Sequence, residues 1–371
     1  MEEGFVRENT VLKIQDLRTY FFSRSKQVFI RSVDGVDLQI NRGETLGIVG
    51  ESGSGKSVTA LSVTGLVTAE PGVITGSVEF TSNGVTKNLL HGLGDFVSLE
   101  TVDGRIMEVE KDNRGWQRNV DLHLHHIRGR EISMIFQNPR VSMNPFMTIG
   151  KQITETIMLN TAIKNVNEAT DRAKYWLEQV KIDSPNLRLE NFPYGLSGGM
   201  CQRAMIAMAL SSEPSLLIAD EPTTGLDSTI QSKIIDLLVD LKNEVEVTTM
   251  LISHDINIIA RLANNVAVMY GGTVLESGPA QKILSKDDEY KHPYTAALLE
   301  SMPDEEHIKL KGHLKAIEGD VLDTVNIPDG CRFYTRCNRV HDRIEDKCKH
   351  TEPDLREISE GRRVRCWLYH N

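Results

Sequence analysis

A glycine-rich segment near the start of the chain carries the residue types that bind a polyphosphate. It fits the pattern G-x-x-x-x-G-K-[S/T], with the residues Gly50, Glu51, Ser52, Gly53, Ser54, Gly55, Lys56 and Ser57. The apolar run 45–49 before it predicts a buried strand, and the residues from Val58 onward can form a helix. Glycines allow backbone N–H groups to converge on phosphate oxygens, and a helix N-terminus adds a favourable dipole. Together they predict a nucleotide-binding site.

The predicted nucleotide site spans residues 50–58, and two of its side chains have distinct expected roles. Lys56 should reach the β- and γ-phosphates, and the hydroxyl of Ser57 should hold Mg²⁺. The alternative is a glycine-rich turn that fits the pattern by chance. The strand expected before the loop and the helix expected after it argue against that alternative.

A pair of carboxylates follows a second apolar run. Residues 216–219 are apolar and lead directly into Asp220 and Glu221, which predicts a buried strand that ends in two acids. Ligands of open α/β sheets bind at the carboxyl ends of the strands. Asp220 should support Mg²⁺ through its water shell, and Glu221 should polarise the water that attacks the γ-phosphate. Taken without the phosphate loop, the pair has a solvated turn as its less favoured alternative.

Further motifs, in this order, resemble those of ATP-binding-cassette (ABC) ATPases. Gln137 matches the Q-loop glutamine of that family, which implies contact with Mg²⁺ and a report of nucleotide state to a partner. Residues 196–200 match the family signature, which serves the γ-phosphate held by the opposite subunit. The resemblance assigns this role to Ser197, Gly198, Gly199 and Met200.

Three more residues take their expected roles from the same resemblance, which covers about residues 11–280. Asp227 matches the D-loop aspartate, which communicates across a dimer, and His254 matches the switch histidine that contacts the γ-phosphate. Tyr20 is the aromatic residue expected to stack on adenine. Phe22 is its rival, because residues two apart on a strand point the same way.

Longer stretches resemble the ATPases of oligopeptide/dipeptide (peptide/nickel) importers, specifically the first of their two paired ATPase subunits. The stretches are 50–59, 135–139, 142–145, 147–150, 196–203 and 292–298. Asn138, Cys201 and Gly225 depart from the usual residues of the group, and none of the three removes a catalytic group. The resemblance implies a heterodimer with a second ATPase, two transmembrane permease subunits, and an extracellular or periplasmic solute-binding protein.

The expected cargo is a peptide, with oligosaccharides or nickel as the alternative. A cassette ATPase of DNA repair or translation fits less well, because such proteins usually carry two cassettes, long coiled coils or zinc hooks. The formal net charge of the 371 residues is −10, which argues against a nucleic-acid partner. No apolar run approaches the ~20 residues that span a bilayer, and the N-terminus does not resemble a signal peptide. The chain is therefore expected at the cytoplasmic face of a membrane, held there by other subunits.

The sequence predicts an α/β fold with a cassette at 1–285 and an extension at 286–371. The cassette should contain a mainly parallel sheet, an antiparallel β subdomain and a helical subdomain at about 138–212. Residues 87–125 are longer than the family needs and predict an extra β insertion, a hairpin with a turn at Asp103 and Gly104. The insertion either has no role of its own or contacts a partner subunit.

Four of the five cysteines lie in the extension: Cys331, Cys337, Cys348 and Cys366. Disulfides are disfavoured in a reducing compartment, and the gaps between these cysteines exceed those of common zinc pairs. Four thiolates can hold a [4Fe–4S] cluster, and the resemblance to the importer ATPases implies such a cluster here. Zinc and unligated thiols remain the alternatives.

Overall fold

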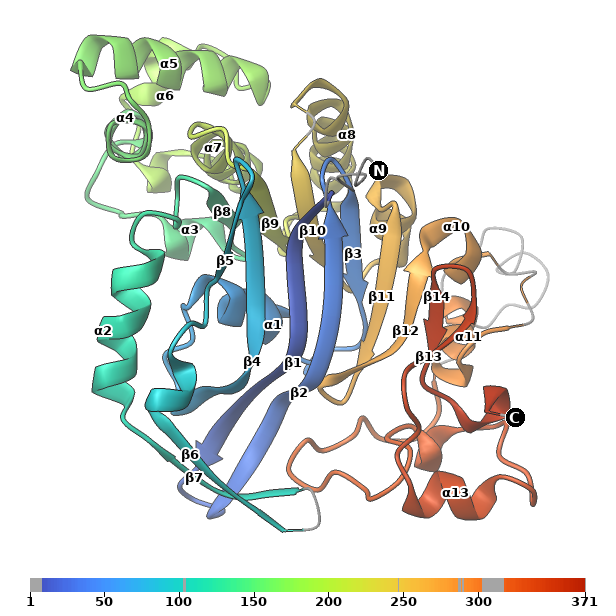
Figure 1. The fold of residues 1–371 in the computed structure, drawn as a ribbon. Helices are drawn as coiled ribbons and strands as arrows, with labels where there is room; N and C mark the ends of the chain where they lie inside the picture. Colours follow the sequence, from blue (N-terminus) through green and yellow to red (C-terminus); the bar gives the residue numbers. More distant parts are fainter. Residues whose placement is uncertain are drawn as a thin grey trace, which may run out of the picture.

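The computed structural model describes residues 9–102, 105–245, 247–285, 288, 290–301 and 317–370. Its centre is an eight-stranded sheet in the order β13-β14-β12-β11-β3-β10-β9-β8 (Figure 1). Strands β8, β9, β10, β3 and β11 run parallel, and β12, β14 and β13 continue the sheet antiparallel. The strands are β3 (Thr45–Val49), β8 (Ile132–Ile135), β9 (Leu216–Asp220), β10 (Thr248–Ser253), β11 (Asn265–Tyr270), β12 (Thr273–Pro279), β13 (Arg356–Ser359) and β14 (Arg362–Val364).

The two apolar runs that predicted buried strands are central strands of this sheet. Every residue of β3 and of β9 is buried. Helices and loops cover both faces of a parallel sheet, so its strands are continuously apolar and do not alternate with polar residues. The prediction of a mainly parallel α/β core is therefore confirmed.

A second sheet packs against the first. It is antiparallel, and its strand order is β2-β1-β4-β5. Leu12 and Val36 of this sheet share one hydrophobic core with Ile48 and Ile252 of the central sheet. The first helix, α1, contributes Ala60 to the same core and contacts strands of both sheets. The elements are β1 (Thr10–Ser23), β2 (Val28–Asn41), β4 (Pro71–Ser82), β5 (Val85–Asn88) and α1 (Lys56–Thr64).

The insertion forms a two-stranded antiparallel hairpin followed by a helix. Strands β6 (Val97–Val102) and β7 (Arg105–Lys111) pair as the sequence predicts, and the expected turn at residues 103–104 lies outside the described residues. The ammonium of Lys111 donates to the carbonyls of Pro71 and Val73, and burial lowers its pKa to about 7. The following helix, α2 (Asn113–Leu124), packs on the end of α1.

A helical layer occupies the stretch between β8 and β9 (Figure 1, green). Side-chain caps set its boundaries: Thr148 accepts from the Lys151 amide at the start of α4, and Asn165 accepts from two amides at the start of α5. The sequence shows helical periodicity through 148–182, and the structure interrupts it between α4 and α5. The helices are α3 (Pro139–Ser142), α4 (Ile149–Asn160), α5 (Val166–Gln179), α6 (Pro185–Leu189) and α7 (Gly198–Leu210), with a short 3₁₀ turn at Pro193–Gly195.

Helices after β9 alternate with the remaining strands and then lead into the extension. They are α8 (Ser228–Val245), α9 (Ile256–Leu262), α10 (Ala280–Ile283), α11 (Pro293–Glu300) and α13 (Glu345–His350), with 3₁₀ turns at Tyr334–Arg336 and Trp367–Tyr369. A further 3₁₀ turn, Leu93–Asp95, lies between β5 and β6. Within the described part of the chain, no helix has the length and apolar character needed to cross a bilayer.

The extension is not a separate globule, because its strand β14 joins the central sheet beside β12. A buried ion pair supports this junction. Arg362 of β14 donates to the carboxylate of Glu276 of β12 at 2.7 Å, and neither side chain is more than 2% exposed. Buried charges of this kind are stable only when they are paired and hydrogen-bonded.

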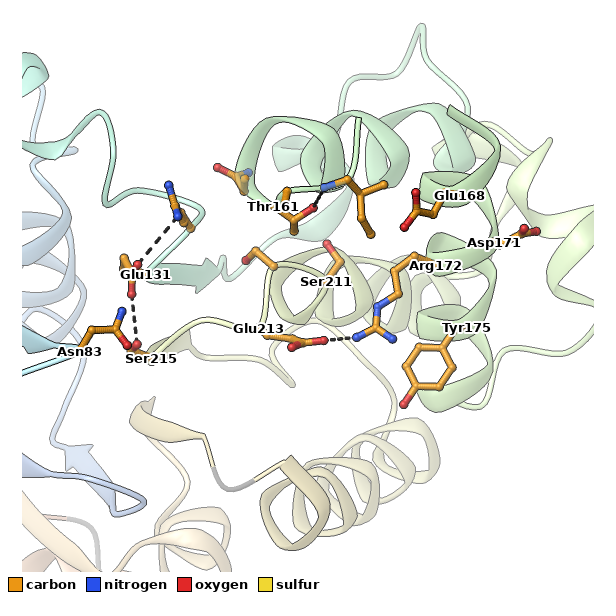
Figure 2. Close-up of a pocket in the computed structure, with 15 residues that line it drawn as sticks. Asn83, Glu131, Thr161, Glu168, Asp171, Arg172, Tyr175, Ser211, Glu213 and Ser215 are labelled. Atoms are coloured by element: carbon orange, nitrogen blue, oxygen red, sulfur yellow. Dashed lines mark hydrogen bonds and ion pairs between the residues drawn. The ribbon is translucent and has the colours of Figure 1, made fainter. Parts of the chain in front are cut away.

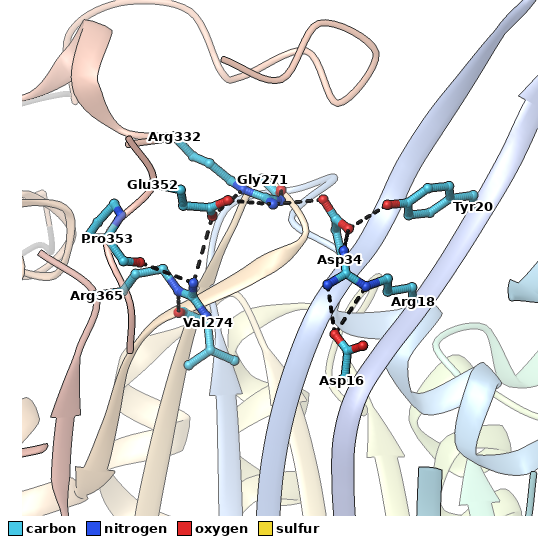
Figure 3. Close-up of polar contacts among 10 residues, drawn as sticks. All are labelled: Asp16, Arg18, Tyr20, Asp34, Gly271, Val274, Arg332, Glu352, Pro353 and Arg365. Atoms are coloured by element: carbon cyan, nitrogen blue, oxygen red, sulfur yellow. Dashed lines mark hydrogen bonds and ion pairs between the residues drawn. The ribbon is translucent and has the colours of Figure 1, made fainter. Parts of the chain in front are cut away.

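A second buried contact joins the extension to the antiparallel sheet at Asp34 (Figure 3). The carboxylate of Asp34 accepts from Arg332 at 2.8 Å, from Arg18 at 2.7 Å and from the Tyr20 hydroxyl at 2.5 Å. Burial by itself would raise the pKa of Asp34. The charge of Arg332 outweighs that effect, with help from Tyr20 and Arg18, and holds the pKa of Asp34 below its usual value.

We predict that Asp34→Asn lowers the free energy of unfolding by about 3 kcal/mol at pH 7, because Arg332 loses its fully buried partner and keeps only the more exposed Glu352. A carboxyl whose pKa is depressed in the folded state stabilises the protein above its unfolded pKa. That contribution is lost as the pH falls below about 4. Urea unfolding at pH 7 and at pH 3.5 should therefore show a large difference that shrinks in acid. Asp236→Asn, which removes an exposed ion pair with Arg261, is the control. Equal losses in the two variants would contradict the prediction.

Candidate functional site

The phosphate-loop segment joins β3 to α1, in the order of strand, loop and helix that the sequence predicts. Two of its glycines cannot be replaced without a clash. A Cβ at Gly50 would lie 2.1 Å from the Met269 carbonyl oxygen, and one at Gly55 would lie 2.2 Å from the Ser32 carbonyl oxygen. Gly55 also has a φ of 100°, in the left-handed region that favours glycine. The backbone is therefore held close to two neighbouring chain segments.

Lys56, the first residue of α1, is buried, and its ammonium lies inside the loop. Its Nζ donates to the carbonyls of Gly50 and Glu51, both at 2.9 Å. Burial lowers the pKa of Lys56, and the carboxylates of Glu221 and Asp220 oppose that effect. A cation enclosed by loop backbone in this way is placed to meet a phosphate that enters the loop.

Asp220 ends β9 beside the loop. Its Oδ1 accepts from the Ser57 hydroxyl at 2.9 Å, and its side chain is largely buried. Burial raises the pKa of Asp220, the Ser57 hydrogen bond lowers it, and the nearby Glu221 raises it further. A hydroxyl and a carboxylate at this separation are oxygen donors of the kind that Mg²⁺ prefers, usually with retained water. The residues present therefore fit the magnesium role that the sequence predicts for Ser57 and Asp220.

Glu221 is held by three side chains. Its Oε2 accepts from the Gln137 amide and from the Thr224 hydroxyl, both at 2.8 Å, and its Oε1 lies 3.3 Å from Nδ1 of His254. Its φ is 46°, a left-handed conformation that is uncommon outside glycine, and its amide donates to the Ile252 carbonyl. Strained backbone of this type recurs at functional sites, where the surrounding structure fixes it.

Strand order explains why these residues meet. Gln137 follows β8, Asp220 ends β9 and Glu221 follows it, His254 follows β10, and the loop follows β3. These strands are parallel neighbours in the order β8-β9-β10-β3, so their carboxyl ends lie along one edge of the sheet. Four motifs that together span more than 200 residues of the sequence, from Gly50 to His254, therefore form one site.

The other two predicted motifs pack against each other. Ser197 caps α7 and accepts from the Met200 amide, and a Cβ on Gly199 would lie 2.5 Å from Ile230. Asp227 is exposed and accepts from the Ile230 amide at the start of α8. The segment 196–200 and the Asp227 turn therefore lie together at the N-terminal ends of two helices.

The prediction for Tyr20 requires a correction. Its side chain is 1% exposed, and its ring packs in a small core with Ile74 and with Ile106 of the inserted hairpin. Its hydroxyl is bound to Asp34. A ring enclosed in this way presents no face on which adenine could stack. The rival, Phe22, is 40% exposed and contacts Phe29 edge-on.

Two kinds of contact at the site were not foreseen from the sequence. Thr224 binds Glu221 and stands only three residues after it, so proximity in sequence was the available signal. Glu51 of the phosphate loop is bound by Tyr294 and Arg336, both from the extension. Tyr294 lies in a stretch that carries the importer resemblance, whereas nothing in the sequence marked Arg336.

The four cysteines of the extension all line one small cavity, together with His292, Phe333 and Trp367. None of them is in a disulfide. Burial raises the pKa of Cys331 and of Cys366 to about 12, so both are neutral thiols at neutral pH in this structure. Among the described residues, no three His, Cys, Asp or Glu side chains are placed to grip a single metal ion.

A separate cleft of about 810 Å³ lies among α4, α5 and the end of α7 (Figure 2). Two pairs of its lining side chains bind each other: Arg172 binds Glu213, and Glu131 binds Ser215. None of the residues predicted for the nucleotide site lines it.

Comparisons with known proteins agree with this geometry. Residues 33–224 match the ABC transporter family, and residues 275–343 match the C-terminal region of oligopeptide/dipeptide transporters. The oligopeptide transport ATP-binding protein AppD of Bacillus subtilis is 41% identical over 97% of each chain. The dipeptide transport ATP-binding protein DppD of Escherichia coli is 37% identical over 96% of each. A dimeric bacterial ABC transporter cassette superposes with a TM-score of 0.55 at 24% identity, covering 72% of this chain and 98% of that one.

The chain belongs to the ABC transporter family. It is an ABC-type ATPase, and that class of enzyme acts on ATP with Mg²⁺. The predicted fold, a cassette followed by a cysteine-containing extension of the oligopeptide type, is confirmed.

We predict that Thr224→Val lowers the kcat for ATP hydrolysis about tenfold and leaves the affinity for ATP nearly unchanged. Valine preserves the shape but cannot donate to Glu221, and a hydrogen bond to a charged group contributes about 1.5–3 kcal/mol. Steady-state kinetics on the assembled transporter would separate kcat from KM. Thr229→Val, at an exposed position of α8, is the matched control. A rise in KM with kcat preserved would count against this role.

Proposed function

We propose that the chain is the ATP-hydrolysing subunit of an ABC importer for peptides. The observation that supports this proposal is the similarity of the chain, over 96–97% of its length, to ATP-binding proteins of oligopeptide and dipeptide transport. Similarity extends through the C-terminal region, which is itself the type found in oligopeptide/dipeptide transporters. The nucleotide site carries no information on the transported solute, so the cargo rests on this similarity.

The proposed chemistry assigns one role to each group at the sheet edge. Lys56 and the loop amides bind the phosphates, and Ser57 and Asp220, with Gln137, hold Mg²⁺. Glu221 polarises the attacking water, while His254 contacts the γ-phosphate. The contacts that Glu221 makes with Gln137, Thr224 and His254 support this assignment, because they fix its carboxylate beside the magnesium ligands.

We further propose that hydrolysis occurs in an ATP-sandwich dimer. Residues Ser197 to Met200 of each subunit would serve the ATP held by the phosphate loop of the other, and Asp227 would communicate between them. Ser197 and Asp227, at the starts of two helices, are exposed, which supports a role across an interface. The partner is a second ABC ATPase, and two transmembrane permease subunits and a solute-binding protein complete the importer. The chain would be peripheral at the cytoplasmic face of the membrane.

The domain limits proposed from the sequence are the cassette at 1–285 and the extension at 286–371. The helical subdomain at about 138–212 would receive the permease subunits. Pairing of β14 with β12 supports a modification of this division, because the extension completes the central sheet of the cassette.

We predict that a peptide-loaded solute-binding protein stimulates ATP hydrolysis by the importer reconstituted in proteoliposomes. Glu221→Gln, with the equivalent change in the partner ATPase, should abolish turnover and retain ATP binding, because glutamine keeps the shape but cannot accept a proton.

Calorimetry on the solute-binding protein encoded beside this chain would test peptides of two to eight residues, short oligosaccharides and nickel. Saccharide or nickel binding without peptide binding would move the cargo to the alternative. Normal turnover of Glu221→Gln would refute the catalytic assignment.

We also propose that the four cysteines of the extension hold a [4Fe–4S] cluster. Four thiolates are the usual ligand set of such a cluster. These four line one small, buried, apolar cavity, although no three of them already lie in a metal-binding arrangement. Iron would displace the thiol protons, as metals do from coordinating cysteines. When bound, the cluster would supply covalent cross-links among distant parts of the extension and a one-electron redox centre.

We predict that protein purified without oxygen contains about four irons per chain and absorbs broadly near 400 nm, as expected of a [4Fe–4S] cluster. Cys348→Ser should lower the iron content, because it removes one ligand. Cys201→Ser should not, because Cys201 is buried in α7 and binds the Pro193 carbonyl. Metal analysis by mass spectrometry decides the matter. Zinc without iron after anaerobic preparation would overturn the proposal.

A further inference from the structure

One short segment of the extension, residues 331–337, reaches back to the nucleotide site. Its two ends, Cys331 and Cys337, line the cysteine cavity. Between them, Arg332 and Arg336 point out of that cavity toward the cassette, where Arg332 binds Asp34 and Arg336 binds Glu51. Arg336 is separated from Glu51 by 285 residues along the chain.

Arg336 binds the first variable residue of the phosphate loop with both of its terminal nitrogens. Nη1 lies 2.7 Å from Oε2 of Glu51, and Nη2 lies 3.1 Å from Oε1. This bidentate arrangement is the most directional that an arginine makes with a carboxylate. The Arg336 side chain is 3% exposed and that of Glu51 is 21% exposed, so solvent screens the pair weakly.

The guanidinium itself is fixed by the extension and by β11. Its Nε donates to the carbonyl of Glu318 at 3.0 Å, and its plane lies near the rings of Tyr270 and Phe333. Every side of the group is therefore occupied by a carbonyl, a carboxylate or an aromatic ring. Such a group acts as a rigid anchor, because it cannot follow a moving partner without breaking several contacts.

Glu51 is bound at each of its polar groups. Its carboxylate accepts from Arg336, its amide donates to the Tyr294 hydroxyl at 2.9 Å, and its carbonyl accepts from Lys56 at 2.9 Å. Two of these three partners belong to the extension. The position of the phosphate-loop lysine is therefore connected, through a single residue, to the fold of the extension.

A second connection reaches the same loop through the turn after β11. Arg332 donates to the Gly271 carbonyl at 2.6 Å, and the Gly272 amide donates to the Ser54 carbonyl at 3.2 Å. Both arginines of the segment thus contact residues that hold the loop backbone.

We propose that Arg336 is a positioning residue for ATP binding, which holds the phosphate loop through Glu51 and neutralises its carboxylate. The inference rests on the assignment of residues 50–57 as the phosphate-binding loop. Without Arg336, an uncompensated carboxylate remains in the loop that must receive the phosphates. That carboxylate repels the nucleotide and competes with it for Lys56. The extension therefore acts on the affinity for ATP and does not touch the reacting atoms.

The test is equilibrium binding of a fluorescent ATP analogue with Mg²⁺ to the full-length chain. Arg336→Gln should weaken binding about tenfold, the size expected from the loss of a charge-assisted pair. Glu51→Gln should weaken it only about threefold, because the loop loses a contact but gains no unpaired charge. The double variant should bind as Glu51→Gln does, and therefore more tightly than Arg336→Gln. Arg356→Gln is the control, since its partner Asp354 lies within the extension.

Rescue by the second substitution separates this role from a merely structural one. If Arg336 only supported the fold of the extension, removing the Glu51 charge would not restore binding, and that result would overturn the proposal. Binding by Arg336→Gln within twofold of the wild type would also overturn it. If that variant does not fold, Arg336→Lys and Tyr294→Phe take its place in the test. Each removes only part of the contact with Glu51 and should measurably weaken binding of the ATP analogue. Wild-type protein that bound no ATP would instead refute the nucleotide-site assignment itself.

Discussion

The site depends on one topological constraint, the parallel order of β8, β9, β10 and β3. Each strand ends at the same edge of the sheet, so residues far apart in sequence arrive within hydrogen-bond distance of one another. Gln137, Glu221 and His254 meet there without any local sequence relation. Continuous apolar runs make the strands, and burial on both faces fixes their register against the helices. The packing that fixes the strands in the core therefore also fixes the positions of the active-site residues.

Electrostatics at that edge follow from the burial that the sheet imposes. Lys56 and Asp220 are both withdrawn from water, and burial disfavours the charge of each. Close partners oppose that effect on each pKa: the carboxylates of Glu221 and Asp220 for Lys56, and the Ser57 hydroxyl for Asp220. A bound phosphate would give Lys56 a negative partner, and Mg²⁺ would give Asp220 a positive one.

Sequence reasoning succeeded where the determinants are local and failed where they are long-range. The glycines of the loop and the acids after β9 carry their chemistry in the order of adjacent residues, and the structure places them as expected. Tyr20 lies on a predicted strand, but its burial depends on Ile106 of the inserted hairpin, which no local pattern reveals. The contact of Arg336 with Glu51 could not be predicted for the same reason, since the two residues are 285 positions apart in the sequence. The convergence of the four cysteines follows from packing of the extension that their irregular spacing does not specify.

The extension connects the cysteine cavity to the nucleotide site. It completes the central sheet through β14 and is fixed by two buried arginines, Arg362 at Glu276 and Arg332 at Asp34. Buried ion pairs contribute little net stability compared with apolar packing, but they are strongly unfavourable when one partner is displaced. They therefore specify a single docked position for the extension. Because Arg336 stands next to Cys337 and binds Glu51, the turn that lines the cysteine cavity also contacts the phosphate loop.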